Sequence, residues 1–241
     1  MTVQLLLSFD DATSHNIRAV DLLEKYGLKA CFYLDTDRLS GEMDENDVRE
    51  LFQRHEIGGH TVTHSNLLEI NHKKAVWEIA ESKIRLEKLV RKPVESFAYP
   101  YGLYDSKIKS ILPEAGYSSG RTTELFNVGI SDDLYEIGVT LWSDPHPYRH
   151  ISSALRLLSP GRIFSEPTLL KNWGNFAKLV LDDMLEARRG VMHVLVHARF
   201  IGERGEWRRL EAMFEDFASR TNLLNPTITE YLASIKGGAP V

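Results

Sequence analysis

Apolar segments of strand length alternate with amphipathic stretches of helical length along most of this chain. Residues 3–9 form an apolar run, and residues 14–26 place Ile17, Val20 and Leu23 at helical spacing after a serine. The same order of strand and helix repeats further along the sequence. Strands that alternate with helices pair in parallel through right-handed crossovers. The pattern therefore predicts an α/β fold, either a barrel or an open doubly wound sheet.

Capping residues mark several element boundaries. Asn71 can cap a long helix that reaches residue 90, and Gly116 can end another. We predict strands at residues 30–34, 94–99, 117–121, 137–142 and 191–197, and helices at 47–55, 71–90, 106–115, 169–189 and 207–219. The chain of 241 residues fits one domain over 1–241, with 235–241 as a flexible tail. Residues 143–167 give no clear pattern.

Composition excludes several classes of function. With 43% hydrophobic and 26% charged residues, the chain is neither a disordered tail nor a membrane bundle. Its net charge is −5 and it has no long basic run, so we expect no nucleic-acid partner. No apolar stretch could cross a bilayer and the first residues do not resemble a signal peptide, so we expect no membrane partner and a cytoplasmic location. Cys31, the single cysteine, is interpreted as buried packing. The sequence leaves the oligomeric state open.

Two groups of potential metal ligands follow predicted strands. Asp10 and Asp11 come directly after the first strand, at the edge where α/β folds carry their active sites, although such a pair can also cap a turn. The run HTVTH contains His60 and His64, and one helical turn would bring both imidazoles onto one face to bind a divalent ion. Solvated or hydrogen-bonded core histidines are the alternative. A carboxylate from another strand end favours a metal, because two histidines and one carboxylate leave coordination positions open.

Two further strand ends carry candidate groups. Residues 97–102, FAYPYG, contain a proline and a glycine that can turn a backbone N–H toward an oxyanion, or they can simply pack two aromatic rings on the surface. His197 ends the run VLVH at the rim of a strand, and His193 lies one layer deeper on the same face. We therefore interpret His193 as a core histidine with satisfied hydrogen bonds.

Together these motifs resemble those of the polysaccharide deacetylase family, metal-dependent N-deacetylases that act on chitin oligomers, peptidoglycan and xylan. SFDDA at residues 8–12 resembles the family's TFDDG motif, and HTVTH matches H-[S/T]-x-x-H at every position. FAYPYG is similar to R-x-P-Y-G, and VLVH to L-x-H. The resemblance runs from residue 8 to residue 197. It implies a distorted (β/α) barrel of parallel strands in a single domain.

The resemblance implies a metal-dependent mechanism. Asp11, His60 and His64 would bind the ion, with Zn²⁺ as the first candidate and Co²⁺ or Ni²⁺ as alternatives. Asp10 would act as the catalytic base that takes a proton from water, and His197 as the general acid that protonates the leaving amine. The products would be acetate and a free amino sugar.

The remaining matches concern the substrate pocket. The resemblance implies that the backbone N–H of Tyr101 holds the oxyanion and that Leu195 lines the acetyl pocket. Residues 141–144, Leu-Trp-Ser-Asp, only loosely match the family's motif with an aspartate and a tryptophan. From this segment Trp142 is a candidate for substrate contact.

The chain departs from the family at Ala98, where the family has an arginine that holds the base aspartate. Without that arginine, Asp10 needs another cation, or the field of the metal itself, to stay ionised. Arg121 and Arg199 lie near predicted strand ends and are candidates. Arginines are mostly exposed, so a surface position is the preferred interpretation of each.

Three functions therefore remain open. The first is an N-deacetylase for an N-acetylated sugar or oligosaccharide. The second is a metal-dependent hydrolase of a small amide or imide on the same fold. The third is a catalytically silent carbohydrate-binding relative, suggested by Ala98 and the loosely matched motif. In the first two cases the partner is a small molecule or an oligosaccharide.

Overall fold

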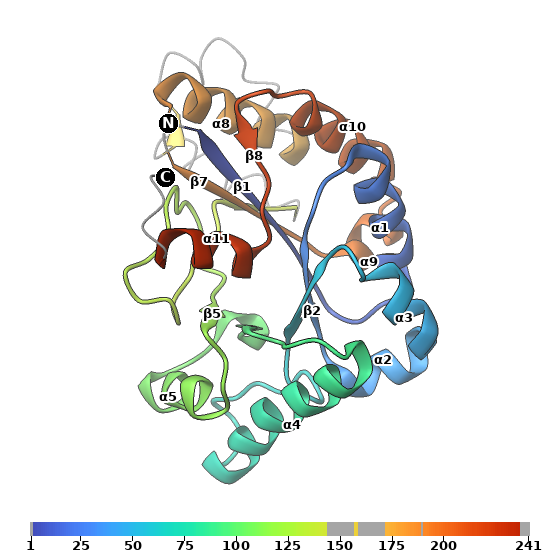
Figure 1. The fold of residues 1–241 in the computed structure, drawn as a ribbon, viewed down its shortest axis with the longest axis vertical. Helices are drawn as coiled ribbons and strands as arrows, with labels where there is room; N and C mark the ends of the chain where they lie inside the picture. Colours follow the sequence, from blue (N-terminus) through green and yellow to red (C-terminus); the bar gives the residue numbers. More distant parts are fainter. Residues whose placement is uncertain (1, 144–156, 159–171, 189, 237–241) are drawn as a thin grey trace.

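The computed structural model describes residues 2–143, 157–158, 172–188 and 190–236. All of its strand pairings are parallel and join into one sheet. In spatial order the sheet runs β5 (Ser119–Arg121), β4 (Ser96–Ala98), β3 (Glu56–Gly59), β2 (Cys31–Leu34), β1 (Val3–Asp10), β7 (Val191–Val196) and β6 (Leu141–Trp142), and β8 (Leu223–Leu224) also pairs with β1. The sheet curls into a half-barrel (Figure 1). This confirms the α/β fold with a distorted barrel of parallel strands in a single domain.

Helices connect the strands and cover the sheet. They are α1 (His15–Tyr26), α2 (Thr36–Glu42), α3 (Glu45–Leu51), α4 (His72–Val90), the 3₁₀ turn η1 (Pro100–Gly102), α5 (Ser106–Glu114), α8 (Trp173–Ala187), α9 (Ala198–Glu203), α10 (Trp207–Ala218) and α11 (Ile228–Lys236). The predicted cap of α4 is confirmed, because the Asn71 side chain accepts a hydrogen bond from the Lys74 N–H at 2.9 Å. Gly116 follows the end of α5 with φ +82°, as its predicted role requires.

Alternation along β1 decides which of its side chains face the interior of the half-barrel. Val3, Leu5, Leu7 and Phe9 pack into the larger apolar core under the helices, whereas Leu6 belongs to a second core inside the curl. Because side chains alternate along a strand, Asp10 lies on the same side as Leu6. The sequence of β1 therefore brings a carboxylate to the carboxyl end of the sheet on its inner side.

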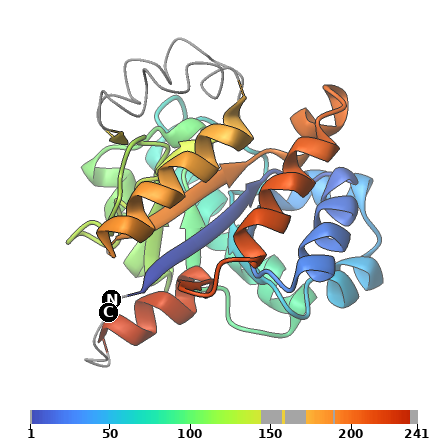
Figure 2. The same ribbon diagram turned by 90° about the horizontal axis from the view of Figure 1, so that it is seen from above.

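Several helices cover the outer face of the sheet, and one helix lies inside its curl. Helices α1, α8 and α10 pack on one another over the outer face, and their apolar stripes join the larger core. Figure 2 shows α11 on the opposite side of β1 and β7 from α8. Its residues Ile228, Tyr231 and Leu232 pack against Leu6 and Cys31 in the inner core. Helix α11 therefore fills the inside of the half-barrel at the amino-terminal ends of the strands.

Some predicted elements differ from the observed ones. The sequence pattern predicts a helix over 47–55, but α3 ends at Leu51, and α2 is an additional short helix. The predicted strand 137–142 is reduced to β6 and an isolated bridge between Ile137 and Arg121. Cys31 is a free buried cysteine, as expected, and burial raises the pKa of its thiol. Most of residues 143–167, and 237–241 of the predicted tail, lie outside the described residues.

Candidate active site

The predicted site residues come together at the carboxyl ends of the strands. Asp10 is the last residue of β1, His60 directly follows β3, and His197 directly follows β7. The turn η1, which contains Tyr101, comes two residues after β4. Active sites of parallel α/β folds form at this edge, because the loops that follow neighbouring strands meet there.

Asp11, His60 and His64 form a cluster that could bind a metal ion. One ligand atom from each of the three lies within 4.8 Å of the others. His60 Nδ1 donates a hydrogen bond to the Ala98 carbonyl at 2.8 Å, which leaves the lone pair of its Nε2 available. His64 Nε2 lies 3.3 Å from Asp11 Oδ1, and His64 Nδ1 lies 3.2 Å from the Tyr101 hydroxyl.

The helical turn considered for the HTVTH run is wrong. Residues 60–64 form an irregular loop in which Thr61 has φ +67° and His64 has φ +57°. This conformation still brings the two imidazoles together, with ring centroids 4.7 Å apart. The convergence of the histidines therefore comes from a strained loop rather than from the periodicity of a helix.

Backbone strain is concentrated around the same cluster. Seven non-glycine residues of the described chain have positive φ, and four of them are Asp11, Thr61, His64 and Tyr101. A left-handed backbone costs roughly 1–2 kcal/mol per non-glycine residue, and such residues often cluster where ligands bind. The surrounding contacts must stabilise these conformations in the folded protein.

Asp10 is held by Arg121, which corrects the interpretation of this arginine as a surface charge. Arg121 is only 1% exposed, and its Nη2 contacts both carboxylate oxygens of Asp10. Arg121 ends β5 directly opposite Ala98 on β4, so a cation is present one strand away from the position of the family's arginine. Arg199 is the surface charge that we expected, and it pairs with Glu203 on α9.

The neighbours of Asp10 keep its carboxylate ionised. Burial alone would raise the pKa of Asp10, but the positive charge of Arg121, followed by His60 and His197, outweighs burial. The net effect lowers the pKa below its usual value. Asp10 is therefore an ionised carboxylate at neutral pH.

His197 stands beside Asp10 at the end of β7. Its Nε2 lies 4.0 Å from Asp10 Oδ2, and its side chain is 21% exposed, so solvent or a substrate can reach it. Its backbone N–H donates to the Ser143 hydroxyl at 3.4 Å. One carboxylate and one imidazole thus lie next to each other at the carboxyl end of the sheet.

The candidate substrate contacts take different positions. Tyr101 is 61% exposed, and its left-handed backbone forms the tight turn of η1. Leu195 is buried in β7 and pairs in register with the half-buried Trp142 of β6. Asp144, from the loosely matched motif, lies outside the described residues.

His193 is a core histidine with satisfied hydrogen bonds, as predicted. Its Nδ1 donates to the Gly138 carbonyl at 3.2 Å, and its Nε2 accepts from the Ser8 hydroxyl at 2.9 Å. Burial, with the nearby charge of Arg121, lowers its pKa to about 3. His193 is therefore neutral and acts in the structure rather than in proton transfer.

Sequence reasoning did not identify two charged neighbours of Asp11. Arg38 Nη1 lies 3.4 Å from Asp11 Oδ1, and Arg38 Nε lies 3.2 Å from Asp35 Oδ2. Asp35 is buried and accepts a hydrogen bond from the Ala12 N–H at 2.8 Å. The only signal in the sequence was the position of Asp35 immediately after β2, the same kind of position that singled out Asp11.

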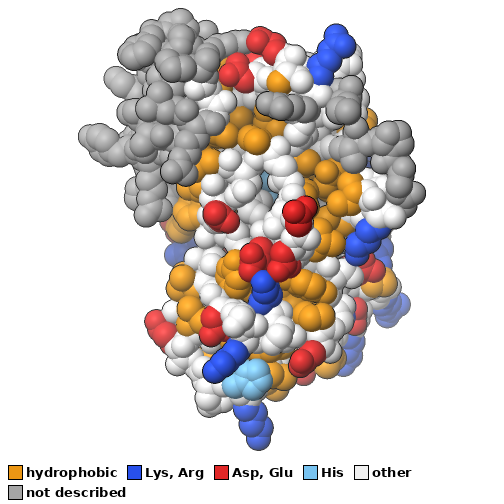
Figure 3. Space-filling model, turned by 90° about the vertical axis from the view of Figure 1, so that its left-hand side faces the viewer, with side chains coloured by type: hydrophobic (Ala, Val, Ile, Leu, Met, Phe, Trp, Pro, Cys, Tyr) orange, Lys and Arg blue, Asp and Glu red, His pale blue; other side chains and the backbone are white. Residues whose placement is uncertain are grey.

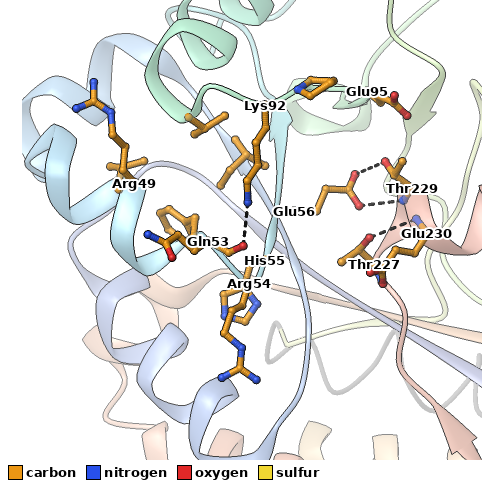
Figure 4. Close-up of a pocket in the computed structure, with 15 residues that line it drawn as sticks. Arg49, Gln53, Arg54, His55, Glu56, Lys92, Glu95, Thr227, Thr229 and Glu230 are labelled. Carbon is orange, nitrogen blue, oxygen red and sulfur yellow. Dashed lines mark hydrogen bonds between the residues drawn. The ribbon is translucent and has the colours of Figure 1, made fainter.

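A cavity of about 690 Å³ is lined by other residues than those of this site (Figure 4). Its lining includes Glu56, the first residue of β3, and Thr227 and Thr229 near the start of α11, so it opens at the amino-terminal ends of the strands. Glu56 accepts hydrogen bonds from Thr229, and Lys92 donates to the Gln53 carbonyl. This cavity is separate from the metal-ligand cluster, and these polar groups are paired with one another.

The surface carries mixed charges. On the face shown in Figure 3, acidic and basic side chains of the described residues lie in small groups between apolar patches, without a continuous basic stripe. Lys109, for example, pairs with Asp133 and Glu136. Among the described helices, none combines the length and apolarity that a membrane span requires.

Comparison with known proteins shows where this fold occurs. Residues 3–120 match the family model described as polysaccharide deacetylase. The Streptococcus pyogenes deacetylase PplD, solved in complex with acetate, superposes with a TM-score of 0.53 at 24% identity and covers 55% of this chain and 62% of that chain. A Mycobacterium smegmatis protein assigned to the polysaccharide deacetylases superposes with a TM-score of 0.71 at 13% identity, over 100% of this chain and 92% of that chain.

The structural relatives also include an inactive type of protein. A CE4 family pseudoenzyme from Bacillus anthracis superposes with a TM-score of 0.60 at 15% identity, over 95% of this chain and 65% of that chain. No curated protein matches the sequence. These structural likenesses are below 25% identity and establish the fold, and the chain spans less than two thirds of the length of PplD.

Proposed function

Residues 3–120 belong to the polysaccharide deacetylase family, and on that premise we propose that the chain is a metal-dependent hydrolase that removes an N-acetyl group from an N-acetylated sugar or oligosaccharide. The observation that carries this proposal is the convergence of Asp11, His60 and His64, with Asp10 and His197 beside them. These five side chains supply the ligands, base and acid that amide hydrolysis requires.

The residues of the cluster fit a divalent ion. Asp11 Oδ1 is buried and accepts no hydrogen bond among the described residues, although Arg38 Nη1 lies 3.4 Å from it, so its lone pairs are available to a cation. The bond from His60 Nδ1 to the Ala98 carbonyl fixes the tautomer that a metal ligand needs. Two imidazoles and one carboxylate suit Zn²⁺, and Co²⁺ or Ni²⁺ as alternatives, and they leave positions open for water and substrate.

Different residues of the chain would perform the separate steps of hydrolysis. A divalent ion at the cluster would act as a Lewis acid and lower the pKa of bound water toward about 7. Asp10, held ionised by Arg121, would accept a proton from the attacking water. The Tyr101 N–H would donate to the oxyanion, a contact whose loss typically costs ~10²–10³ in rate. His197 would donate a proton to the departing amine.

Acetate release tests the proposal. The protein is incubated with N-acetylated sugars and chitin oligomers in the presence of Zn²⁺, Co²⁺ or Ni²⁺, and we expect acetate release that a chelator abolishes. Asp11→Ala should lose the metal, whereas Asp10→Asn should keep the metal and lose turnover. A panel without acetate release under any of the three ions would overturn the proposal.

Two alternatives predict different results from the same protein. A hydrolase of small amides or imides would cleave those substrates but none of the sugars. A catalytically silent relative would bind metal and sugar without turnover on any substrate. The intact set of Asp10, Asp11, His60, His64 and His197 favours turnover over silence. A cytoplasmic location remains a prediction.

A further inference from the structure

Glu78 is a buried carboxylate that the proposed reaction does not use. It lies on α4, and its side chain is 0% exposed. Its Oε2 accepts the backbone N–H groups of Val62 and Thr63, each at 2.9 Å. Its Oε1 accepts the Thr63 hydroxyl at 2.8 Å and lies 3.2 Å from Lys74 Nζ. Three of these four contacts therefore go to the loop between the two histidine ligands.

That loop needs an external acceptor. Thr61 and His64 have positive φ, and the loop belongs to no helix or strand that would pair its N–H groups. An unpaired buried N–H typically costs about 1–3 kcal/mol, so without Glu78 another conformation of residues 60–64 would compete. The other side of the loop is held through carbonyls, since Thr61 and Val62 accept the N–H groups of Thr36 and Asp37 at 3.3 and 2.9 Å.

The position of the loop decides where the imidazoles lie. His64 directly follows Val62 and Thr63, the two residues that Glu78 holds, and His60 precedes them with one residue between. A shift of Val62 and Thr63 would therefore move His64 relative to Asp11, from which its Nε2 is now 3.3 Å away. Residues that orient metal ligands from outside the coordination sphere commonly change metal affinity ~10–100-fold when they are replaced.

We propose that Glu78 is a positioning residue that tunes the divalent-ion affinity of the cluster by fixing the loop between His60 and His64. It touches neither the ion nor the substrate, and the proposal rests on the proposed function. This role requires the full length of the glutamate side chain, because both of its carboxylate oxygens accept hydrogen bonds from Val62 and Thr63.

Two variants of Glu78 distinguish the effect of its side-chain length from the effect of its charge. Glu78→Asp keeps the charge but shortens the side chain by one methylene, so its carboxylate stops short of the loop. Glu78→Gln keeps the length, and its amide oxygen can accept both backbone N–H groups while its NH₂ group donates to the Thr63 hydroxyl. The NH₂ group cannot accept from Lys74, whose partly exposed side chain can turn to solvent. Ser82→Ala, one turn further along α4 and also buried, is the matched control for a general effect on the helix.

Zinc affinity of the metal-free protein is measured by competition with a chromophoric chelator, together with hydrogen exchange of the Val62 and Thr63 amides. We expect Glu78→Asp to weaken Zn²⁺ binding ~10–100-fold and to speed hydrogen exchange of both amides. The zinc affinities of Glu78→Gln and Ser82→Ala should stay within about threefold of the wild-type value. Wild-type affinity in Glu78→Asp, or an equal loss in Ser82→Ala, would overturn the inference. A wild-type protein that binds no divalent ion would instead refute the proposed function, and this inference with it.

Discussion

Replacement of Arg121 by methionine tests the assignment of Asp10 as an ionised base. In the wild type, Arg121 is the main influence that offsets the burial of Asp10. An adjacent arginine typically lowers an aspartate pKa by about 1–3 units, so its removal should raise the pKa of Asp10 by that amount. Burial then remains the dominant influence, and the pKa should move above the ordinary value near 3.9.

Carbon-13 NMR of the Asp10 carboxyl group in the metal-free protein measures this pKa without a substrate. The acid limb of kcat/KM in the metal-loaded enzyme should move upward in the same direction. Arg199→Met removes a surface arginine and should leave both titrations unchanged. Arg121→Lys keeps the charge but loses the planar guanidinium, so its effect should be intermediate. A folded Arg121→Met protein in which Asp10 titrates as in the wild type would refute the reasoning.

The same substitution carries a cost in stability whose sign depends on pH. An aspartate with a lowered pKa in the folded state stabilises the fold above its unfolded pKa, and this stabilisation is lost as pH falls through the folded pKa. Removal of one partner of a buried ion pair costs about 3–5 kcal/mol at neutral pH. The loss should shrink at pH values that protonate Asp10, which urea unfolding at several pH values can measure.

Three further predictions concern other residues. His193 is neutral in the folded protein, because its pKa is about 3 against 6.5 for the free side chain. The free energy of unfolding of the wild type should therefore decrease below pH 6.5 by up to about 1.4 kcal/mol per pH unit. Urea titrations of His193→Asn should show a smaller decrease. His60→Ala should abolish Zn²⁺ binding in calorimetry, whereas His197→Asn should keep it and lower kcat by about 10²–10⁴; equal metal loss in both would contradict the assigned roles. Cys31 should resist thiol reagents in the native protein and react only after unfolding, as a timed labelling experiment can check.

Elements with strong local signals were predictable from the sequence. Helix α4 begins after a capping asparagine and carries apolar residues at helical spacing, and β1 is a run of apolar residues. The sequence therefore predicted the first residue of each element correctly. Helix α2 was not predicted because its seven residues bury only Thr36 and Leu39, too few for a periodic pattern. Local pattern therefore predicts long elements better than short ones.

The site was predictable where its residues occur in short motifs. Asp10, Asp11, His60, His64 and His197 were all singled out because each belongs to a short motif at or just after the carboxyl end of a strand.

Arg121 and Glu78 were not assigned to the site because their partners are distant in sequence or belong to the backbone. Arg121 lies 111 residues from Asp10, and sequence alone favoured a surface position for it. Glu78 bonds mainly to the Val62 and Thr63 amides, which have no side-chain signature. The conformation of residues 60–64 was also beyond local reasoning, since a contact from α4 supports it.

The register between β4 and β5 has a consequence for how such proteins are recognised. Ala98 on β4 and Arg121 on β5 are paired in register. The guanidinium of Arg121 therefore reaches the Asp10 carboxylate from the strand next to the one that carries Ala98. The pKa of Asp10 depends on where the positive charge lies in space, and not on which segment of the chain supplies it. A motif search that scores one segment alone would classify this chain as lacking a cation that it possesses, and inactivity should not be assigned to a homologue on that basis.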